Sequence, residues 1–427
     1  MQYELFLASE HTETIEALSG LTDFVIESGC ACRCVSDSSK LGFASVVGDR
    51  KNQVRLSMRL ARSLSSKSPR KVPRDFHFAE PIKARDVKHL RDTEATSGSI
   101  EDLALRIVSE VDRHIDPRDQ LEIEQLVVER SVLTKHIVTS EHLDAKEVGT
   151  WIQVEAAVRH RGKNLWAQLT SRTLAGLHIE DLVDNLREQA TLSELGFCPR
   201  ESKGFPLLLA PAAVAKLLGP IVEEGMAGNS ASSGGLLGML QRGQRIFAQG
   251  ITIQDNGRLP GGICSSSWDD EWSPTANTTL VRRGCSWNRM YDLLTASRNG
   301  VRPTGNGFRM GVHHPVSVMP TNVVVSGGRR SVQEILDDYE WCVLAHEIDP
   351  SVAPDGVCVI NVPQGTVFRK GKAVGRTRKP LDYRLSLEAP MDFPAEISSE
   401  IRWVGSMMAP FAILVVIGKY TSRGASG

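Results

Sequence analysis

The chain of 427 residues is long enough for two domains, each with its own hydrophobic core. Its 50 basic and 51 acidic side chains leave a formal net charge of −1, so we expect no general attraction to nucleic acid or to an anionic membrane. The most apolar run, residues 411–418, is far shorter than the roughly 20 residues of a membrane-spanning helix and predicts a buried strand.

The N-terminus has neither a basic leader nor an unbroken apolar core, so we expect no secretory signal and a cytoplasmic location. Close to it, Cys30, Cys32 and Cys34 alternate along a strand-like segment, which places the three thiols on one face. Such a run could bind a metal, but no second group of Cys or His follows at the spacing of a zinc site. Packed, reduced thiols are the favoured interpretation, and a metal site is the alternative.

The first half combines strands and helices. Residues 65–98 are rich in Pro, Lys and Arg, but acidic residues interrupt the basic ones and no aromatic stacking pattern accompanies them, which favours a solvated linker over a nucleic-acid patch. Ser99 and Asp102 form a capping box ahead of an amphipathic helix. The other predicted elements are strands at 2–7, 22–27, 30–35, 42–46, 152–158 and 165–170, and helices at 54–64 and 179–192.

The second half is richer in Gly and Ser and has many short strand-like runs. Pro199 and Gly204 mark a boundary between an N-terminal domain of residues 1–194 and a C-terminal domain of residues 195–427. Helices are predicted at 212–224 and at 331–338, the second opening on a Ser331–Glu334 capping box. Strands are predicted at 206–210, 245–253, 278–282, 322–326, 357–362, 366–370 and 411–417. We therefore predict an α+β chain whose second domain is mostly β.

A zinc protease helix needs two histidines one turn apart with a glutamate between them. The one His-Glu pair, His346-Glu347, is followed by Pro350 and by no second histidine, so it does not fit. His313 and His314 would point to opposite faces of a strand, which makes them a poor pair of ligands.

Phosphate loops and serine-nucleophile elbows are also missing from the sequence. The acidic run Asp269, Asp270 and Glu271 could hold a hard cation, but a turn whose carboxylates cap backbone amides is the commoner arrangement. The residues alone therefore show no complete catalytic constellation.

Several segments, in fixed order, resemble the TldD/PmbA peptidase family. The similarity consists of an S/T-G-N-G loop, a P-T-N strand, a Gly turn and an S-x-x-E helix start, and it extends to an acidic segment and to strands near the N-terminus. These segments are residues 29–34, 42–45, 251–255, 268–271, 295–309, 320–328 and 331–336. Trp287, Trp341 and the Cys-rich strand depart from the family pattern and indicate a divergent, pathway-specific member.

The resemblance implies which of two subunit types this chain is. TldD-type chains carry H-E-x-x-x-H on a helix and a further ligand near the C-terminus, whereas PmbA/TldE-type chains lack them. Residues 217–224 align with that helix, so Gly219 and Glu224 occupy ligand positions and Pro220 replaces the catalytic glutamate. No cysteine follows Cys358 to supply a late thiolate, and the adjacent Glu223 and Glu224 indicate a solvated helix edge. We therefore expect no metal and no catalytic residue in this chain.

The implied function is that of a non-catalytic subunit in a heterodimer with a TldD-type partner, which would hold the zinc. The pair would enclose a chamber in which unfolded or precursor peptides are cut, and leader removal from a ribosomally made peptide is one such role. This chain would wall the chamber and help to bind extended peptide, for instance by strand addition. Candidate contact residues for substrate or partner are Thr304, Gly305, Asn306, Gly307, Arg309, Asn322, Asp269, Asp270 and Glu271.

Two alternatives remain open at the level of sequence. The chain could be a metal-dependent hydrolase in its own right, with a ligand set such as Glu223, Glu224 and either His313 or His314. It could also be a stand-alone scaffold that binds peptides without any partner.

Overall fold

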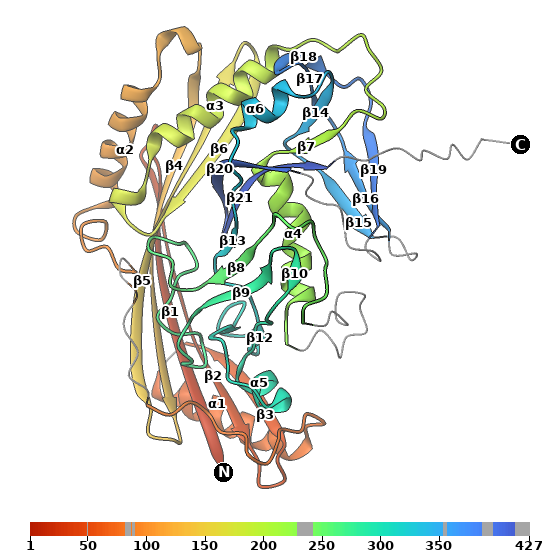
Figure 1. Cartoon of the computed structure of the whole chain (residues 1–427). Coiled ribbons are helices and arrows are strands. Elements are labelled where there is room, and N and C mark those ends of the chain that lie inside the picture. Colours follow the sequence, from red (N-terminus) through yellow and green to blue (C-terminus); the bar gives the residue numbers. More distant parts are fainter. Residues whose placement is uncertain are drawn as a thin grey trace, which may run out of the picture.

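The first half of the chain builds an antiparallel sheet that runs along one side of the molecule (Figure 1). Its strands are β1 (Gln2–Glu16), β2 (Leu21–Val35), β3 (Leu41–Val47), β4 (Glu122–Thr139), β5 (Asp144–His160) and β6 (Lys163–Ser171). They lie in the order β3-β2-β1-β4-β5-β6. The computed structural model describes residues 1–48, 50–81, 87, 90–228, 242–352, 357–386 and 396–414.

Helices cover one face of this sheet. They are α1 (Lys51–Lys67), α2 (Ile100–His114) and α3 (Ile179–Glu194), with short 3-10 turns at Pro117–Asp119 and Leu174–Gly176. The predicted capping box begins α2, because the Asp102 amide donates to Ser99 Oγ at 3.1 Å. Alternate residues of β5, such as Ile152 and Val154, are fully buried against α2 and α3. The amphipathic patterns of the first half are therefore confirmed, and the opposite face of the sheet is left for the second half.

Two of the predicted N-terminal strands are a single strand. Backbone pairing of β1 with β2 is continuous from Gln2 opposite Val35 to Glu16 opposite Leu21, with no break between the segments expected at 22–27 and 30–35. The predicted break was wrong because antiparallel pairing along the whole of β1 outweighs the weak local propensity of the Glu-Ser-Gly step in β2. β1 and β2 thus form one continuous hairpin of two 15-residue strands.

The segment expected to be a solvated linker is partly buried. Phe76 and Phe78 are only 3% and 1% exposed, and the Arg33 guanidinium lies 5.2 Å from the centre of the Phe78 ring. The basic and proline-rich composition concealed these apolar residues, which pack between the first sheet and helical residues of the second half such as Leu293. Residues 82–86 and 88–89 of this segment lie outside the described residues.

The second half contains a larger sheet that runs β10-β9-β8-β13-β21-β7-β14-β17-β18, with β20 paired to β21. Beside it lie the small sheets β11-β12 and β15-β16-β19. The strands are β7 (Leu207–Leu209), β8 (Ile253–Asn256), β9 (Asn277–Arg282), β10 (Cys285–Ser286), β11 (Gly307–Phe308), β12 (Ser317–Val318), β13 (Val323–Val325), β14 (Cys342–Ala345), β15 (Asp349–Val352), β16 (Val357–Val362), β17 (Thr366–Arg369), β18 (Lys372–Arg376), β19 (Leu381–Ser386), β20 (Glu396–Val404) and β21 (Met407–Leu414).

Three helices accompany these strands: α4 (Pro211–Gly225), α5 (Leu293–Asn299) and α6 (Val332–Asp337). The α+β prediction is confirmed, as are both predicted helices and the Ser331–Glu334 capping box. The strand predicted at 245–253 is wrong except at Ile253, where β8 begins. The amides of Ile246 and Phe247 both donate to the carbonyl of Gly284, which lies in the turn between β9 and β10, instead of pairing along a strand. Residues 415–417 of the last predicted strand lie outside the described residues, and the domain boundary near residue 195 stays a prediction.

The core of the second half lies between α4 and the larger sheet. Leu217, Leu218, Ile221 and Val222 of α4 are buried against strand residues from β7, β8, β13 and β14. Among the helices described, none combines the length and apolar character needed to cross a membrane.

Phe78→Ala tests whether the basic segment is part of the packed interior. The substitution removes a fully buried ring and its contact with Arg33, so we expect the free energy of unfolding to fall by about 3–5 kcal/mol. Chemical denaturation followed by circular dichroism measures this. Phe24→Ala, at a ring that is 56% exposed, is the matched control and should change it by less than about 1 kcal/mol. Equal effects of the two substitutions would contradict the packing described.

Candidate functional site

The helix that aligns with the family's zinc motif turns its altered positions outward. Buried residues such as Leu218 and Val222 hold one side of α4 against the sheet, while Pro220, Glu223 and Glu224 lie on its exposed side. The two glutamates therefore form the solvated edge that their adjacency predicted.

The residues of α4 do not fit a zinc ion. Gly219 has no side chain to coordinate, and Pro220 has no carboxylate that could take a proton from a metal-bound water. Within the described residues, no three His, Cys, Asp or Glu side chains come together as a metal-binding group.

The histidines considered as alternative ligands lie elsewhere. His313 and His314 follow β11 and line a cavity against β1 and β2, and they form no metal-binding group with Glu223 and Glu224. The hydrolase ligand set proposed from sequence is therefore not assembled. His346 lies between β14 and β15 rather than on a helix, and burial lowers its pKa.

The acidic run forms the amide-capping turn that was the commoner expectation. Asp269 accepts hydrogen bonds from the amides of Glu271, Ser273 and Gly307 at 2.8–3.0 Å. Asp270 Oδ2 accepts from the Arg309 amide at 2.9 Å, and its Oδ1 lies 2.9 Å from Lys135 Nζ. These carboxylates thus fix the turn against β11 and leave no arrangement suited to a hard cation.

The loop of Thr304, Gly305, Asn306 and Gly307 is joined to the larger sheet through Asp255 on β8. Asn306 Nδ2 donates to Asp255 Oδ2 at 2.6 Å, and Thr304 Oγ1 donates to Asn306 Oδ1 at 2.6 Å. Gly305 has a φ of +73°, which favours glycine, and a Cβ at Gly307 would overlap the Glu271 carboxylate. The motif therefore sets backbone geometry, and direct contact of its residues with substrate or partner stays a prediction.

Asn322, directly before β13, also fixes backbone geometry through its side chain. Its Oδ1 accepts from the Cys264 amide at 3.0 Å, and its Nδ2 donates to Ser265 Oγ and to the Asn256 carbonyl at 2.9 Å each. The side chain is fully buried, so it positions residues 264–265. Contact of Asn322 with a ligand also stays a prediction.

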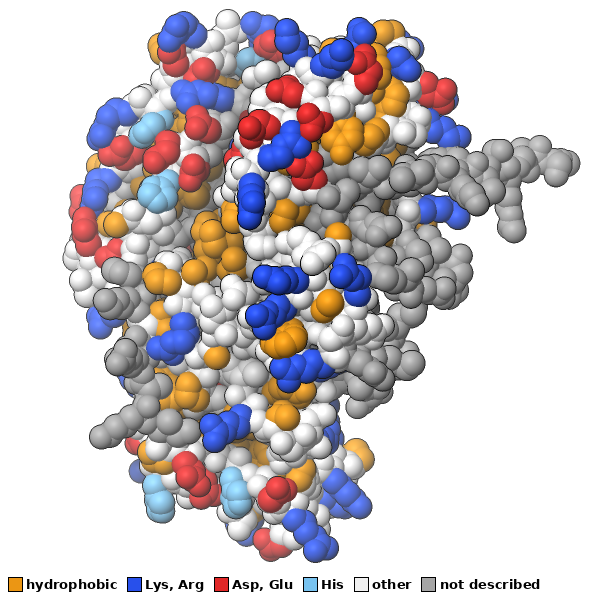
Figure 2. Space-filling model, viewed as in Figure 1, with side chains coloured by type: hydrophobic (Ala, Val, Ile, Leu, Met, Phe, Trp, Pro, Cys, Tyr) orange, Lys and Arg blue, Asp and Glu red, His pale blue; other side chains and the backbone are white. Residues whose placement is uncertain are grey.

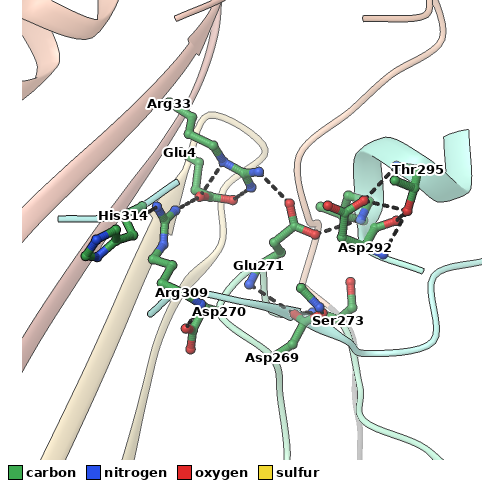
Figure 3. Close-up of polar contacts among 12 residues, drawn as sticks. Glu4, Arg33, Asp269, Asp270, Glu271, Ser273, Asp292, Thr295, Arg309 and His314 are labelled. Carbon is green, nitrogen blue, oxygen red and sulfur yellow. Dashed lines mark hydrogen bonds and ion pairs between the residues drawn. The ribbon is translucent and has the colours of Figure 1, made fainter. Parts of the chain in front are cut away.

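A buried chain of four charges joins the first sheet to these loops (Figure 3). Arg33 on β2 donates to Glu4 on β1 through Nε, at 2.9 Å, and through Nη2, and it donates to Glu271 Oε1 through Nη1 at 2.5 Å. Arg309 Nη2 donates to Glu4 Oε1 at 2.8 Å. All four residues are at most 8% exposed. We call this set, Glu271–Arg33–Glu4–Arg309, the charge chain.

Burial raises the pKa values of several carboxyl groups in this region. It raises the pKa of Glu271 to about 7, with Asp292 and Glu4 adding to the effect while Arg33 opposes it. It raises the pKa of Asp255 to about 6, although Asn306 and Thr321 donate hydrogen bonds that favour the ionised form. The pKa of Asp269 is also raised, by burial and by the charge of Glu271.

Two adjoining cavities lie between the uncovered face of the first sheet and the loops of the second half. They measure about 550 and 630 Å³ and share Leu133, Lys135 and Arg309. β4, β5 and β6 form the floor of the smaller cavity, and residues 263–266, 308–309 and 319–321 form its wall. Hydrophobic side chains gather between the first sheet and the second half on the face shown in Figure 2. We call the two cavities together the groove.

Among the sequence candidates, Asp270 and Arg309 line the groove, and Asn306 and Asn322 position its wall from behind. Sequence reasoning missed Lys135 and Arg172, which also line it. Burial alone would lower the pKa of Lys135, but Asp270 and Glu147 outweigh it and raise the pKa. No local motif surrounds either residue, so only the pairing of strands could have revealed them.

A groove thus separates the first sheet from the loops of the second half, and α4 carries no histidine. Residues 202–416 match the family described as PmbA/TldA metallopeptidase C-terminal domain. The chain therefore belongs to the PmbA/TldD metallopeptidase family.

Individual proteins are similar to this chain in fold or in sequence. The structure is similar to that of TldE from Thermococcus kodakarensis, with a TM-score of 0.77, 17% identity and coverage of 96% of this chain and 94% of that one; at this identity the likeness shows the fold. An uncharacterized protein of Methanocaldococcus jannaschii is 23% identical over 58% of each chain. A Synechocystis metalloprotease is 31% identical over 26% of this chain. The chain spans 58% and 24%, respectively, of the lengths of these two relatives.

Arg33→Met tests the charge chain. The substitution leaves Glu271 buried without its cation and removes the chelating partner of Glu4, so we expect the unfolding free energy to fall by about 3–5 kcal/mol. Arg106→Met is the control, because Arg106 pairs with Glu94 on the surface, where both side chains are at least 60% exposed. Its effect should stay below about 1 kcal/mol. A loss in Arg33→Met no larger than in this control would show that the charge chain does not stabilise the fold.

Asp255→Asn tests the effect of burial on a carboxyl group. The pKa of Asp255 is about 6 in the folded chain and about 4 when unfolded, so its protonation favours the folded state. This contribution is fully present below about pH 4 and is lost as the pH rises through about 6. Between about pH 5 and pH 7.5 we expect the wild type to lose about 1 kcal/mol that the variant does not lose.

Denaturation curves at several pH values measure this difference. Asp37→Asn, at a carboxyl that is 98% exposed, should leave the pH dependence of the wild type unchanged. A pH dependence that is identical in Asp255→Asn and the wild type would contradict the assignment to Asp255.

Proposed function

We propose that this chain is the non-catalytic, TldE/PmbA-type subunit of a heterodimeric TldD/TldE-type zinc metalloprotease. The observation that carries the proposal is α4, whose sequence resembles the family's H-E-x-x-x-H helix but has Gly219 and Pro220 where that motif has histidine and glutamate. The fold shared with TldE of Thermococcus kodakarensis supports it. The zinc and the catalytic residues would then belong to a TldD-type partner with an H-E-x-x-x-H helix.

In such a complex this chain would supply walls and a binding surface. The groove has volumes in the range of ligand sites, and its floor is a sheet whose strands β4 and β5 are each longer than 15 residues. An extended peptide can lie along such a surface and contact apolar groups such as Trp151 and Phe308. The substrate would be an unfolded or precursor peptide, and leader removal from a ribosomally made peptide is one such role.

Co-expression with a TldD-type subunit tests the proposal. We expect the two chains to co-purify, zinc to be held by the partner, and cleavage of an unfolded peptide to require both chains. Replacing the glutamate of the partner's H-E-x-x-x-H motif by glutamine should abolish cleavage without separating the subunits.

Two results would contradict the proposal. Stoichiometric zinc in this chain alone, with peptide cleavage unaided, would favour a hydrolase in its own right. Failure to co-purify, with no change in the partner's proteolysis on addition of this chain, would favour a stand-alone peptide-binding scaffold.

A further inference from the structure

One buried cation of the groove forms no ion pair with any of the residues that the structure describes. Arg172 directly follows β6 and lines the cavity of about 550 Å³, yet it is only 8% exposed. Arg33 and Arg309 are also at most 8% exposed, and each forms an ion pair with Glu4. Across the described part of the chain, Arg172 forms no ion pair. A buried charge without a counterion is costly, so its presence in a cavity points to a ligand.

The hydrogen bonds of Arg172 leave donors free. Nη2 donates to the Ser265 carbonyl at 2.9 Å and Nη1 to the Thr150 carbonyl at 3.4 Å, whereas Nε is buried and lacks a partner among the described residues. A guanidinium has five N–H donors, and two neutral carbonyl oxygens leave it without a hydrogen-bonded counterion. Two backbone contacts therefore hold the group in place and leave three of its five N–H groups without a hydrogen-bond acceptor among the described residues.

The floor of the cavity is shaped to hold this guanidinium. Its carbon lies 5.4 Å from the centre of the Trp151 ring, and a Cβ at Gly149 would lie 2.8 Å from Nη1. Both residues are on β5, where side chains two positions apart share one face. Glycine at 149 thus gives the guanidinium room beside Trp151.

The other charges of this cavity are already engaged. Glu147 accepts from Ser266 Oγ and, at 2.8 Å, from the Ser267 amide, and it lies beyond ion-pair distance of Arg172. Lys135 is paired with Asp270. The remaining lining is largely apolar and includes Leu90, Leu133, Ile263, Phe308, Met319 and Pro320. Among its described lining residues, the cavity therefore has one cation outside any ion pair, with room for an apolar group.

We propose that this cavity binds a carboxylate through Arg172, and that the carboxylate is the C-terminus of a peptide with an apolar last residue. The identification of the ligand as a peptide rests on the proposed function. A guanidinium matches a carboxylate in two parallel hydrogen bonds, which a point charge such as lysine does not reproduce. The apolar lining would receive the last side chain. The groove then selects a chain end rather than an internal sequence.

Binding of short peptides to the full chain tests this site. The probe is a five-residue peptide of alanines ending in leucine, prepared as the free acid and as the C-terminal amide, with tryptophan fluorescence and calorimetry as readouts. We expect the free acid to bind about 10–100-fold more tightly, because a hydrogen-bonded charge is lost in the amide. Equal affinities would overturn the proposal, and this comparison needs no variant.

Substitutions locate the effect. Arg172→Met should bring the affinity for the free acid down to that for the amide, Arg172→Lys should recover part of the difference, and the control Arg106→Met should retain all of it. Gly149→Ala displaces the guanidinium without changing its charge and should also weaken binding of the free acid. Retention of full selectivity for the free acid in Arg172→Met would overturn the assignment to this residue.

A third peptide separates the two sources of a carboxylate. It has an amidated C-terminus and a glutamate as its last residue, and we expect it to bind as weakly as the leucine amide. Binding as tight as that of the free acid would overturn the assignment to a chain terminus. Because this chain alone is titrated, the result is independent of co-purification with a TldD-type partner, so the two proposals can fail separately.

Discussion

The charge chain is the constraint on which the groove depends. Glu4 and Arg33 come from the first sheet and Glu271 and Arg309 from loops of the second half, so two segments up to 305 residues apart share one desolvated network. Removing ions from water costs several kcal/mol each, and alternation of two acids with two bases is what makes that burial tolerable. The sheet and the loops must therefore approach in one arrangement, and that arrangement defines the floor and wall of the groove.

The loop motifs work through the backbone in support of this network. Asp269 and Asp270 bind amides of their own turn and of β11, while Asn306 and Asn322 join the loops to β8 and to residues 264–265. These side chains satisfy backbone polar groups that no neighbouring strand pairs. Residues that resemble a recognition motif in sequence are thus largely occupied within the fold, and the surface available to a ligand is the one they position.

Local signals explain why much of the fold was predictable. Ser99 and Ser331 begin helices because their hydroxyls and a following acid satisfy amides within one turn, and α3 follows from its apolar spacing alone. The continuity of β2 and the burial of Phe78 were missed, since each is decided by a partner distant in the sequence. Lys135 and Arg172 were missed for the same reason: a charged residue is unremarkable until its environment is known.

If the chain is the proposed subunit, Arg172 is a binding group that such a subunit keeps although it holds no metal. In the proposed complex, the absence of metal ligands on α4 removes catalysis from this subunit. It does not affect the groove, because no α4 residue lines it. Two other cations of the groove are held in internal ion pairs, Lys135 with Asp270 and Arg309 with Glu4. One unpaired guanidinium on that background has a large effect, because a charged hydrogen bond in a largely apolar cavity discriminates more strongly than added apolar contact does. Binding of a chain end and catalysis can therefore reside in different subunits of one complex.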